Sequence, residues 1–278
     1  GPSSTSLTAK SGDFVHVLAA DPIRSSSDMP NGPTAGRRGI AVAAATSLLA
    51  LAAFLALTPR AGADAARASE VRVVGAGTLT GPTVVLAKPR ANAPQVGTLR
   101  QFRPDYRPQY VLALSVVKAR KTRKPLWYRL SVPGRPNGRT GWVPASAVDL
   151  FPVKKRILID VGARRFEFWS GRRLLRSGRV AVGAPGTETP TGLFYVTWKF
   201  DPRIDPNWSG LGNYAFETSA YSPNLSDWPG GGIVGLHGTP QPYLLGQAVS
   251  HGCVRFHNRD IEFLKPRVPL GTPIKIVP

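Results

Sequence analysis

Short runs in which apolar and polar residues alternate dominate the chain from about residue 70 onward, separated by glycine, proline and asparagine. In the second half, five runs have the length of a strand: residues 156–161, 165–169, 174–182, 194–198 and 272–277. Period-two alternation across short, glycine-containing turns is typical of β-hairpins. We therefore predict a mainly antiparallel sheet that forms a sandwich-like or barrel-like domain over residues 153–278.

A second series of strand-sized runs lies between residues 70 and 150. Its members are residues 71–74, 83–86, 110–114, 127–130 and 140–143. Closely spaced short strands with frequent turn residues predict a small all-β, barrel-like domain. The hairpin from Trp127 to Trp142 resembles the closing hairpin of bacterial Src-homology-3-like modules.

One short helix is expected, over residues 259–264, with Asn258 as its N-cap and acidic residues in its first turn. The predicted fold class is therefore mainly β with one short helix. Residues 201–232 show little periodicity, and long irregular segments in compact domains are often functional loops. Aromatic side chains in this segment either line a cleft or pack the loop onto the sheet; they are Tyr214, Phe216, Tyr221 and Trp228.

Residues 40–58 form an uncharged apolar run directly after Arg37 and Arg38. A basic flank, an apolar body and the following small residues suit a cleaved signal peptide, and the length also permits a membrane anchor. Both interpretations make residues 39–63 an export segment and place the protein outside the cytoplasm. The only methionine, Met29, suits a native start, so we expect residues 1–38 to be a disordered, basic leader.

Basic residues exceed acidic ones, 36 against 16, which gives a formal net charge of +20. Eleven of the basic residues lie between Arg100 and Thr140, where Asp105 is the only acid. Such a surface favours polyanions, which for an exported protein are anionic wall polymers or a membrane surface. A solvated loop explains the same charges equally well. Nucleic acid would need them too, but it is not an expected partner outside the cytoplasm.

The only cysteine, Cys253, ends a Ser-His-Gly-Cys run at residues 250–253, and His237 lies upstream. A thiolate attacks carbonyl groups when a nearby imidazole takes the thiol proton, so these two residues form a candidate nucleophile and base. A lone cysteine is more often a small buried hydrophobe, but the flanking glycine and histidines favour chemistry. A zinc site that adds His251 and His257 is the other alternative; its spacing matches no common zinc motif. We predict no metal and no cofactor.

These segments resemble those of the L,D-transpeptidases with a YkuD-type catalytic domain. The family signature is a His-containing segment followed by Ser/Thr-His-Gly-Cys and then Arg and Asn. His237, residues 250–253, Arg255 and Asn258 match it. The Thr-Pro-Thr-Gly run at residues 189–192 is similar to the family's turn before a strand. The resemblance covers about residues 153–278.

The resemblance implies a cysteine acyltransferase that acts on peptidoglycan stem peptides. Cys253, activated by His237, would release the terminal D-Ala of a stem tetrapeptide, form a thioester and pass the acyl group to a neighbouring stem as a 3→3 cross-link. Carbapenems would acylate the same cysteine. An oxyanion-binding, substrate-binding or supporting role is expected for four neighbours: Ser250, His251, Gly252 and Arg255. An internal ion pair is an equally ordinary use of Arg255.

Two other functions stay open. If water replaces the acceptor amine, the same site is an L,D-carboxypeptidase or cysteine peptidase on the same stems. A non-catalytic wall-binding protein would instead use the basic module and leave Cys253 incidental. The presence of both His237 and Cys253 in their family settings argues against that third function.

Overall fold

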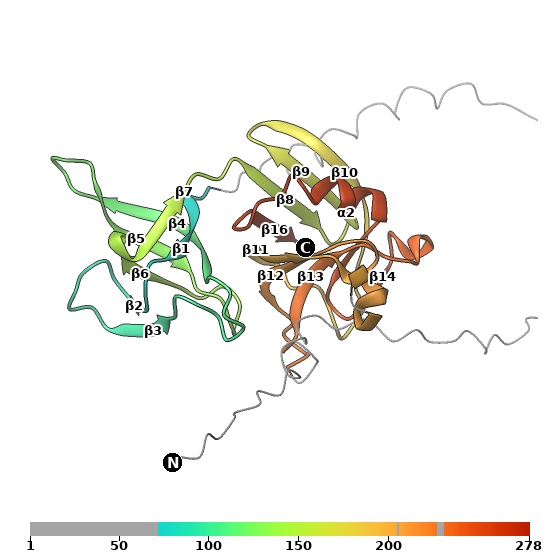
Figure 1. The fold of residues 1–278 in the computed structure, drawn as a ribbon, viewed down its shortest axis with the longest axis horizontal. Helices are drawn as coiled ribbons and strands as arrows, with labels where there is room; N and C mark the ends of the chain where they lie inside the picture. Colours follow the sequence, from blue (N-terminus) through green and yellow to red (C-terminus); the bar gives the residue numbers. More distant parts are fainter. Residues whose placement is uncertain (1–71, 205, 227–230) are drawn as a thin grey trace, which may run out of the picture. The chain divides into compact units, whose positions relative to one another are not determined.

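The computed structural model describes residues 72–204, 206–226 and 231–278 (Figure 1). The expected leader and export segment, residues 1–63, lie outside the described residues, and so does Trp228. No helix in the described ranges is long and apolar enough to cross a membrane.

Seven strands of the described chain form a first sheet, in the order β3-β2-β6-β5-β4-β1-β7, and every pairing in it is antiparallel. The strands are β1 (Gly75–Leu79), β2 (Thr83–Leu86), β3 (Gln95–Leu99), β4 (Tyr110–Lys118), β5 (Pro125–Ser131), β6 (Thr140–Pro144) and β7 (Val148–Phe151). Its core includes the fully buried Val85, Leu130 and Val143.

The strand predicted at residues 71–74 is wrong, because β1 begins at Gly75. Glycines are poor strand formers, but here the neighbouring strand requires them. A Cβ on Gly75 would lie 2.5 Å from the carbonyl oxygen of Phe151, and one on Gly77 would lie 2.3 Å from that of Asp149. The close approach of β1 to β7 therefore depends on Gly75 and Gly77. Because glycine is uncommon in strands, the same residues made β1 hard to predict from the sequence.

Nine described strands form a second sheet, in the order β14-β10-β15-β13-β12-β11-β16-β8-β9. They are β8 (Lys155–Asp160), β9 (Arg165–Ser170), β10 (Arg173–Gly183), β11 (Gly192–Phe200), β12 (Ala215–Tyr221), β13 (Ile233–His237), β14 (Ala248–Ser250), β15 (Val254–Phe256) and β16 (Pro273–Val277). A further pairing of β10 with β9 closes the sheet into a barrel. Buried aromatic and aliphatic side chains, among them Phe166, Phe216 and Leu236, fill it. The predicted mainly β fold class is confirmed.

The helix α2 (Asn258–Leu264) lies where the sequence predicts it, but its cap differs. His257 is the N-cap, since its Nδ1 accepts a hydrogen bond from the backbone N–H of Arg259 at 3.2 Å. The predicted cap at Asn258 is wrong. The Asn258 side chain instead accepts from the backbone N–H groups of Asn213, at 3.2 Å, and Thr239, at 3.1 Å.

The segment 201–232, predicted to be irregular, contains β12 and two 3-10 turns, Pro202–Ile204 and Pro206–Leu211. Six of the seven β12 residues are buried, so the strand shows no alternation of apolar and polar positions. Tyr214 and Phe216 pack in the barrel core, as expected if they hold the loop to the sheet.

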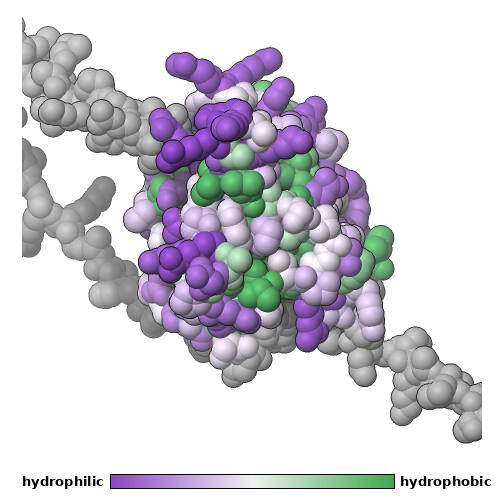
Figure 2. Space-filling view, turned by 90° about the vertical axis from the view of Figure 1, so that its left-hand side faces the viewer, coloured by the Kyte–Doolittle hydropathy of each residue, from purple (hydrophilic) through white to green (hydrophobic). Residues whose placement is uncertain are grey.

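The basic run in the first sheet forms the tip of the β4–β5 hairpin. Its charged side chains are exposed: Lys118, Arg120, Lys121, Arg123 and Lys124. None of them makes an ion pair with another described residue. The face of the molecule in Figure 2 is mostly hydrophilic and carries small, separate hydrophobic areas.

Candidate active site

His237 is the last residue of β13, and Cys253 directly precedes β15, the strand that pairs with β13 in parallel. The register sets Arg255 opposite His237, so Cys253, just before β15, comes opposite Gly235. The backbone N–H of Gly235 donates to Cys253 Sγ at 3.3 Å. Because residues two apart in a strand point to the same face, the thiol and the imidazole lie on one face of the sheet.

The His237 imidazole is buried, with 2% of its surface exposed. Burial lowers its pKa to about 4, although the carbonyl groups of Gly238 and Leu211 oppose the shift. Nδ1 lies 2.6 Å from the carbonyl oxygen of Gly238. A carbonyl oxygen only accepts, so Nδ1 carries the proton and Nε2 is the basic nitrogen of the neutral ring. At neutral pH the ring is therefore ready to accept a proton.

Burial also raises the pKa of the Cys253 thiol, and the N–H of Gly235 partly opposes the shift. Both groups of the pair are consequently neutral at rest. Transfer of the thiol proton to the imidazole would make a thiolate and an imidazolium together. The N–H of Gly235 then stabilises the charge on sulfur, as a donor to an anion does.

The turn that presents Cys253 is held by its own serine. Buried Ser250 donates through Oγ to the carbonyl oxygen of Cys253 at 2.5 Å and accepts from the N–H of Gly252 at 3.1 Å. Gly252 has φ +114°, a conformation that favours glycine. These contacts fix the backbone on both sides of the sulfur.

Side chains of residues 183–191 form hydrogen bonds to the backbone of this turn. Thr189 Oγ1 donates to the carbonyl oxygen of Gly252 at 2.9 Å and accepts from the N–H of Gly183 at 2.9 Å. Thr187 Oγ1 donates to the carbonyl oxygen of Ser250 at 3.0 Å. The Thr-Pro-Thr-Gly run, which the sequence marked only by resemblance, therefore starts with a side chain bonded to the nucleophile turn.

Arg255 is 7% exposed and lies on the same face as Cys253, and burial lowers the pKa of its guanidinium. His251, two residues before Cys253 in the sequence, is half-buried. Both side chains interact with other groups of the protein. Within the described residues, no three His, Cys, Asp or Glu side chains gather as a metal site.

Asn258 is a residue of this site whose role the sequence did not reveal. Its Oδ1 binds the N–H of Thr239, two residues after His237, and that of Asn213 in the adjoining loop. A Cβ on Gly238 would lie only 2.1 Å from that oxygen, so glycine is needed for the approach. The sequence marked Asn258 in two ways: the family signature, which gave it no role, and the helix-cap pattern, which pointed to a different role.

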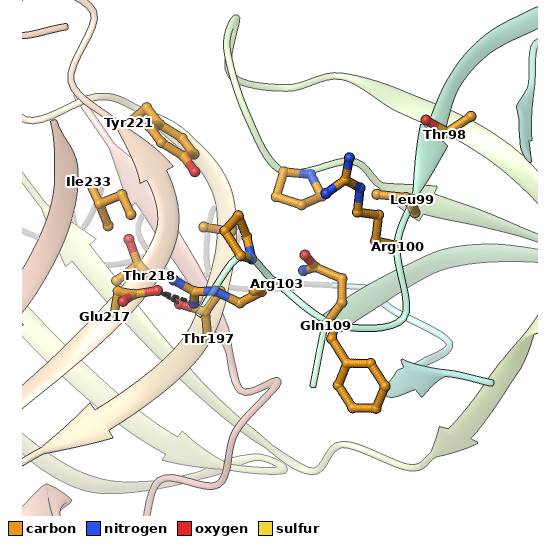
Figure 3. Close-up of a pocket in the computed structure, with 14 residues that line it drawn as sticks. Thr98, Leu99, Arg100, Arg103, Gln109, Thr197, Glu217, Thr218, Tyr221 and Ile233 are labelled. Carbon is orange, nitrogen blue, oxygen red and sulfur yellow. Dashed lines mark hydrogen bonds and ion pairs between the residues drawn. The ribbon is translucent and has the colours of Figure 1, made fainter. Parts of the chain in front are cut away.

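A cavity of about 290 Å³ opens at β12 and is lined by Glu217, among other residues (Figure 3). Arg103, in the connection between β3 and β4, forms an ion pair with Glu217 there, and Thr197 Oγ1 donates to the same carboxylate oxygen at 2.7 Å. Glu217 pairs with Gly235 in the sheet register, so Glu217, Gly235 and Cys253 form a row across three strands.

Comparison with known proteins identifies the family. Residues 154–276 match the model of the YkuD-type L,D-transpeptidase catalytic domain. The YkuD protein of Bacillus licheniformis is 35% identical over 126 residues, which are 45% of this chain and 67% of that protein. The YkuD protein of Bacillus subtilis is 31% identical over 128 residues, 46% of this chain and 69% of that protein.

Among solved structures, an L,D-transpeptidase from Mycobacterium smegmatis is 18% identical, with a TM-score of 0.38 over 61% of this chain and 90% of that one. The chain belongs to the L,D-transpeptidase family, as the signature residues indicated. The resemblance of the Trp127–Trp142 hairpin to Src-homology-3-like modules stays a prediction.

Proposed function

We propose that this protein is an exported peptidoglycan L,D-transpeptidase that forms 3→3 cross-links through a thioester on Cys253. The observation that carries the proposal is the pairing of β13 with β15. It sets a neutral, buried imidazole and a thiol on one face, with the thiol on a turn held by Ser250 and Thr189. Family membership supplies the substrate class, stem peptides, and with it an extracytoplasmic place of action.

The first half-reaction makes the acyl-enzyme. Nε2 of His237 takes the thiol proton as Sγ of Cys253 attacks the carbonyl carbon between the third stem residue and D-Ala. Backbone N–H groups at Gly252 and Cys253 are the candidate donors to the oxyanion. The C–N bond then breaks, the leaving amine of D-Ala takes the proton from the imidazolium, and a thioester remains.

The second half-reaction reverses these steps with a new amine. The side-chain amine of a neighbouring stem attacks the thioester carbonyl and gives a proton to His237. The C–S bond breaks, the N–H of Gly235 stabilises the departing sulfur, and the proton returns to it. Arg255, on the same face, suits a substrate carboxylate.

The test is intact mass spectrometry of the full chain and its Cys253→Ser variant, after incubation with a carbapenem and, separately, with a disaccharide tetrapeptide. We expect a covalent adduct on wild type alone and a Cys253-dependent cross-linked dimer with loss of D-Ala. Released D-Ala and tripeptide without dimers at high acceptor concentration would make the protein a carboxypeptidase. Neither adduct nor product would leave a wall-binding role.

A further inference from the structure

The turn between β5 and β6 of the first sheet contacts the catalytic barrel through two side chains, Arg135 and Asn137. Arg135 donates to three carbonyl oxygens of the β12–β13 connection: Nη1 to Gly231 at 2.9 Å, and Nη2 to Ser222 and Leu225 at 2.8 Å each. A planar guanidinium fork suits several fixed acceptors, which a lysine ammonium cannot match in the same geometry. One side chain thus joins both ends of this connection.

Asn137 bonds the residue just before the connection in both directions. Its Nδ2 donates to the carbonyl oxygen of Tyr221 at 2.7 Å, and its Oδ1 accepts from the N–H of Tyr221 at 3.0 Å. The Arg135 guanidinium also lies 5.0 Å from the centre of the Tyr221 ring, within the range of a cation–π contact. The end of β12 is therefore held by the first sheet through backbone and ring alike.

The backbone of the connection is shaped around this guanidinium. Gly232 has φ +71°, and a Cβ there would lie 1.8 Å from the carbonyl oxygen of Leu225 and 2.6 Å from Nη2 of Arg135. The N–H of Ser222 donates to the carbonyl oxygen of Gly232 at 2.8 Å and closes the base of the connection. No side chain larger than glycine fits beside Arg135 at this point.

The same connection lies against the nucleophile turn. Ser222 is buried, and its Cβ lies 3.9 Å from the position that a Cβ on Gly252 would occupy, next to Cys253. Two residues on, Asn224 Nδ2 donates to the carbonyl oxygen of Gly186 at 2.8 Å, within the run that holds the nucleophile turn. The residue whose carbonyl binds Arg135 is thus also a neighbour of the sulfur-bearing turn.

We propose that Arg135 and Asn137 are positioning residues of the active site: the β5–β6 turn fixes the β12–β13 connection against the turn that presents Cys253. The inference rests on the proposed function, and it assigns the first sheet an indirect part in the reaction, through the position of the turn that carries Cys253, besides any role in wall binding. A misplacement of about 1 Å at a reacting centre costs on the order of 100-fold in rate. Loss of the Arg135 and Asn137 contacts, which we call the clamp, therefore lowers the rate of acylation.

The test compares wild type with Arg135→Ala, Arg135→Lys and Asn137→Ala in the full chain. Arg129→Ala is the matched control, because Arg129 lies on the same hairpin and bonds only Thr140 within it. The readouts are the rate constant and the half-saturating concentration for carbapenem acylation of Cys253, amide hydrogen exchange at residues 221–226 and 231–235, and the midpoint of thermal unfolding.

For Arg135→Ala we expect an acylation rate constant lowered by about 10-fold to 100-fold and faster exchange in both segments. Arg135→Lys and Asn137→Ala should fall between it and wild type, and the control should match wild type. A general loss of stability would move the unfolding midpoint without this pattern of exchange, and Arg135→Lys covers the case in which the alanine variant does not fold. Wild-type acylation and exchange in both Arg135 variants would overturn the inference. If wild type itself is not acylated, the proposed function fails, and the exchange data alone decide on the clamp.

Discussion

At the scale of single residues, the site is notable for groups that are uncharged at rest. Burial moves the pKa of His237 down and that of Cys253 up, so each shift opposes a resting thiolate–imidazolium pair. Such a sulfur is protected from indiscriminate reaction, because the thiolate is the reactive form. In the proposed mechanism, the sulfur becomes nucleophilic when the bound substrate promotes transfer of its proton to His237.

The buried imidazole also makes stability depend on pH. Its pKa is about 4 in the folded protein, below the ordinary value of about 6.5 of an exposed imidazole. The unfolded chain therefore binds this proton more readily, and the stabilisation is present above pH 6.5 and lost as the pH falls toward 4. The difference corresponds to up to about 3 kcal/mol in the free energy of unfolding.

Urea unfolding at several pH values between 7 and 4 measures this effect, with His237→Asn as the comparison. Asparagine cannot take the proton, so the variant should lose less stability than wild type over this range. Equal losses in the two proteins would show that His237 is not held neutral by the fold.

At the scale of elements, the sequence predicted the strands that alternate and missed those that do not. The hairpins from β8 to β10 were predicted because one face of each strand is apolar. β12 is buried on both faces, and β14 and β15 have three residues each, too short to show a period. Cys253 and His237 were predicted as a pair from their chemistry, because the parallel pairing of β13 with β15 leaves no local signal in the sequence.

The start of α2 gives a prediction that separates two polar residues. His257→Ala removes a side-chain cap and should lower the free energy of unfolding by about 1 kcal/mol with little effect on acylation. Asn258→Ala leaves the N–H groups of Asn213 and Thr239 without their acceptor, which costs about 1–3 kcal/mol for each buried donor. It also frees the segment that follows His237, so acylation should slow.

Chemical unfolding and carbapenem acylation rates of the two variants check this prediction. Asn258→Asp, which keeps the acceptor oxygen, is the control and should restore most of the lost rate. If His257→Ala slowed acylation more than Asn258→Ala, the helix cap and not the Asn258 contact would position His237.

At the scale of the whole molecule, residues of the first sheet and its connections contact the catalytic barrel at more than one place. Besides the Arg135 contacts, Tyr195 of β11 donates through its hydroxyl to the carbonyl oxygen of Tyr110 in β4 at 3.0 Å. The sequence predicted two β domains but no such contacts, because nothing in the sequence distinguishes an arginine or tyrosine that contacts another sheet from one on the surface. The basic side chains of the β4–β5 hairpin are exposed, and an anionic polymer as their partner stays a prediction.

Removal of the ion pair between Arg103 and Glu217 tests whether contacts between the two sheet regions contribute to stability. Glu217 is 2% exposed at its side chain and its Oε2 has no partner among the described groups, so it depends on Arg103. Removal of one partner of a buried pair costs about 3–5 kcal/mol, because the other charge stays buried alone. Arg103→Met should therefore lower the free energy of unfolding by about 3 kcal/mol, and the double variant with Glu217→Gln should recover part of the loss.

Urea unfolding of the single and double variants measures the cycle, with Arg203→Met as the control. Arg203 pairs with Asp201 at the surface, where solvent screens the interaction, and its loss should leave stability nearly unchanged. A first sheet that docks independently of this pair would give Arg103→Met the same small effect as the control. If instead the loss is large and acylation of Cys253 slows with it, the row from Glu217 through Gly235 to Cys253 transmits the state of the first sheet to the sulfur.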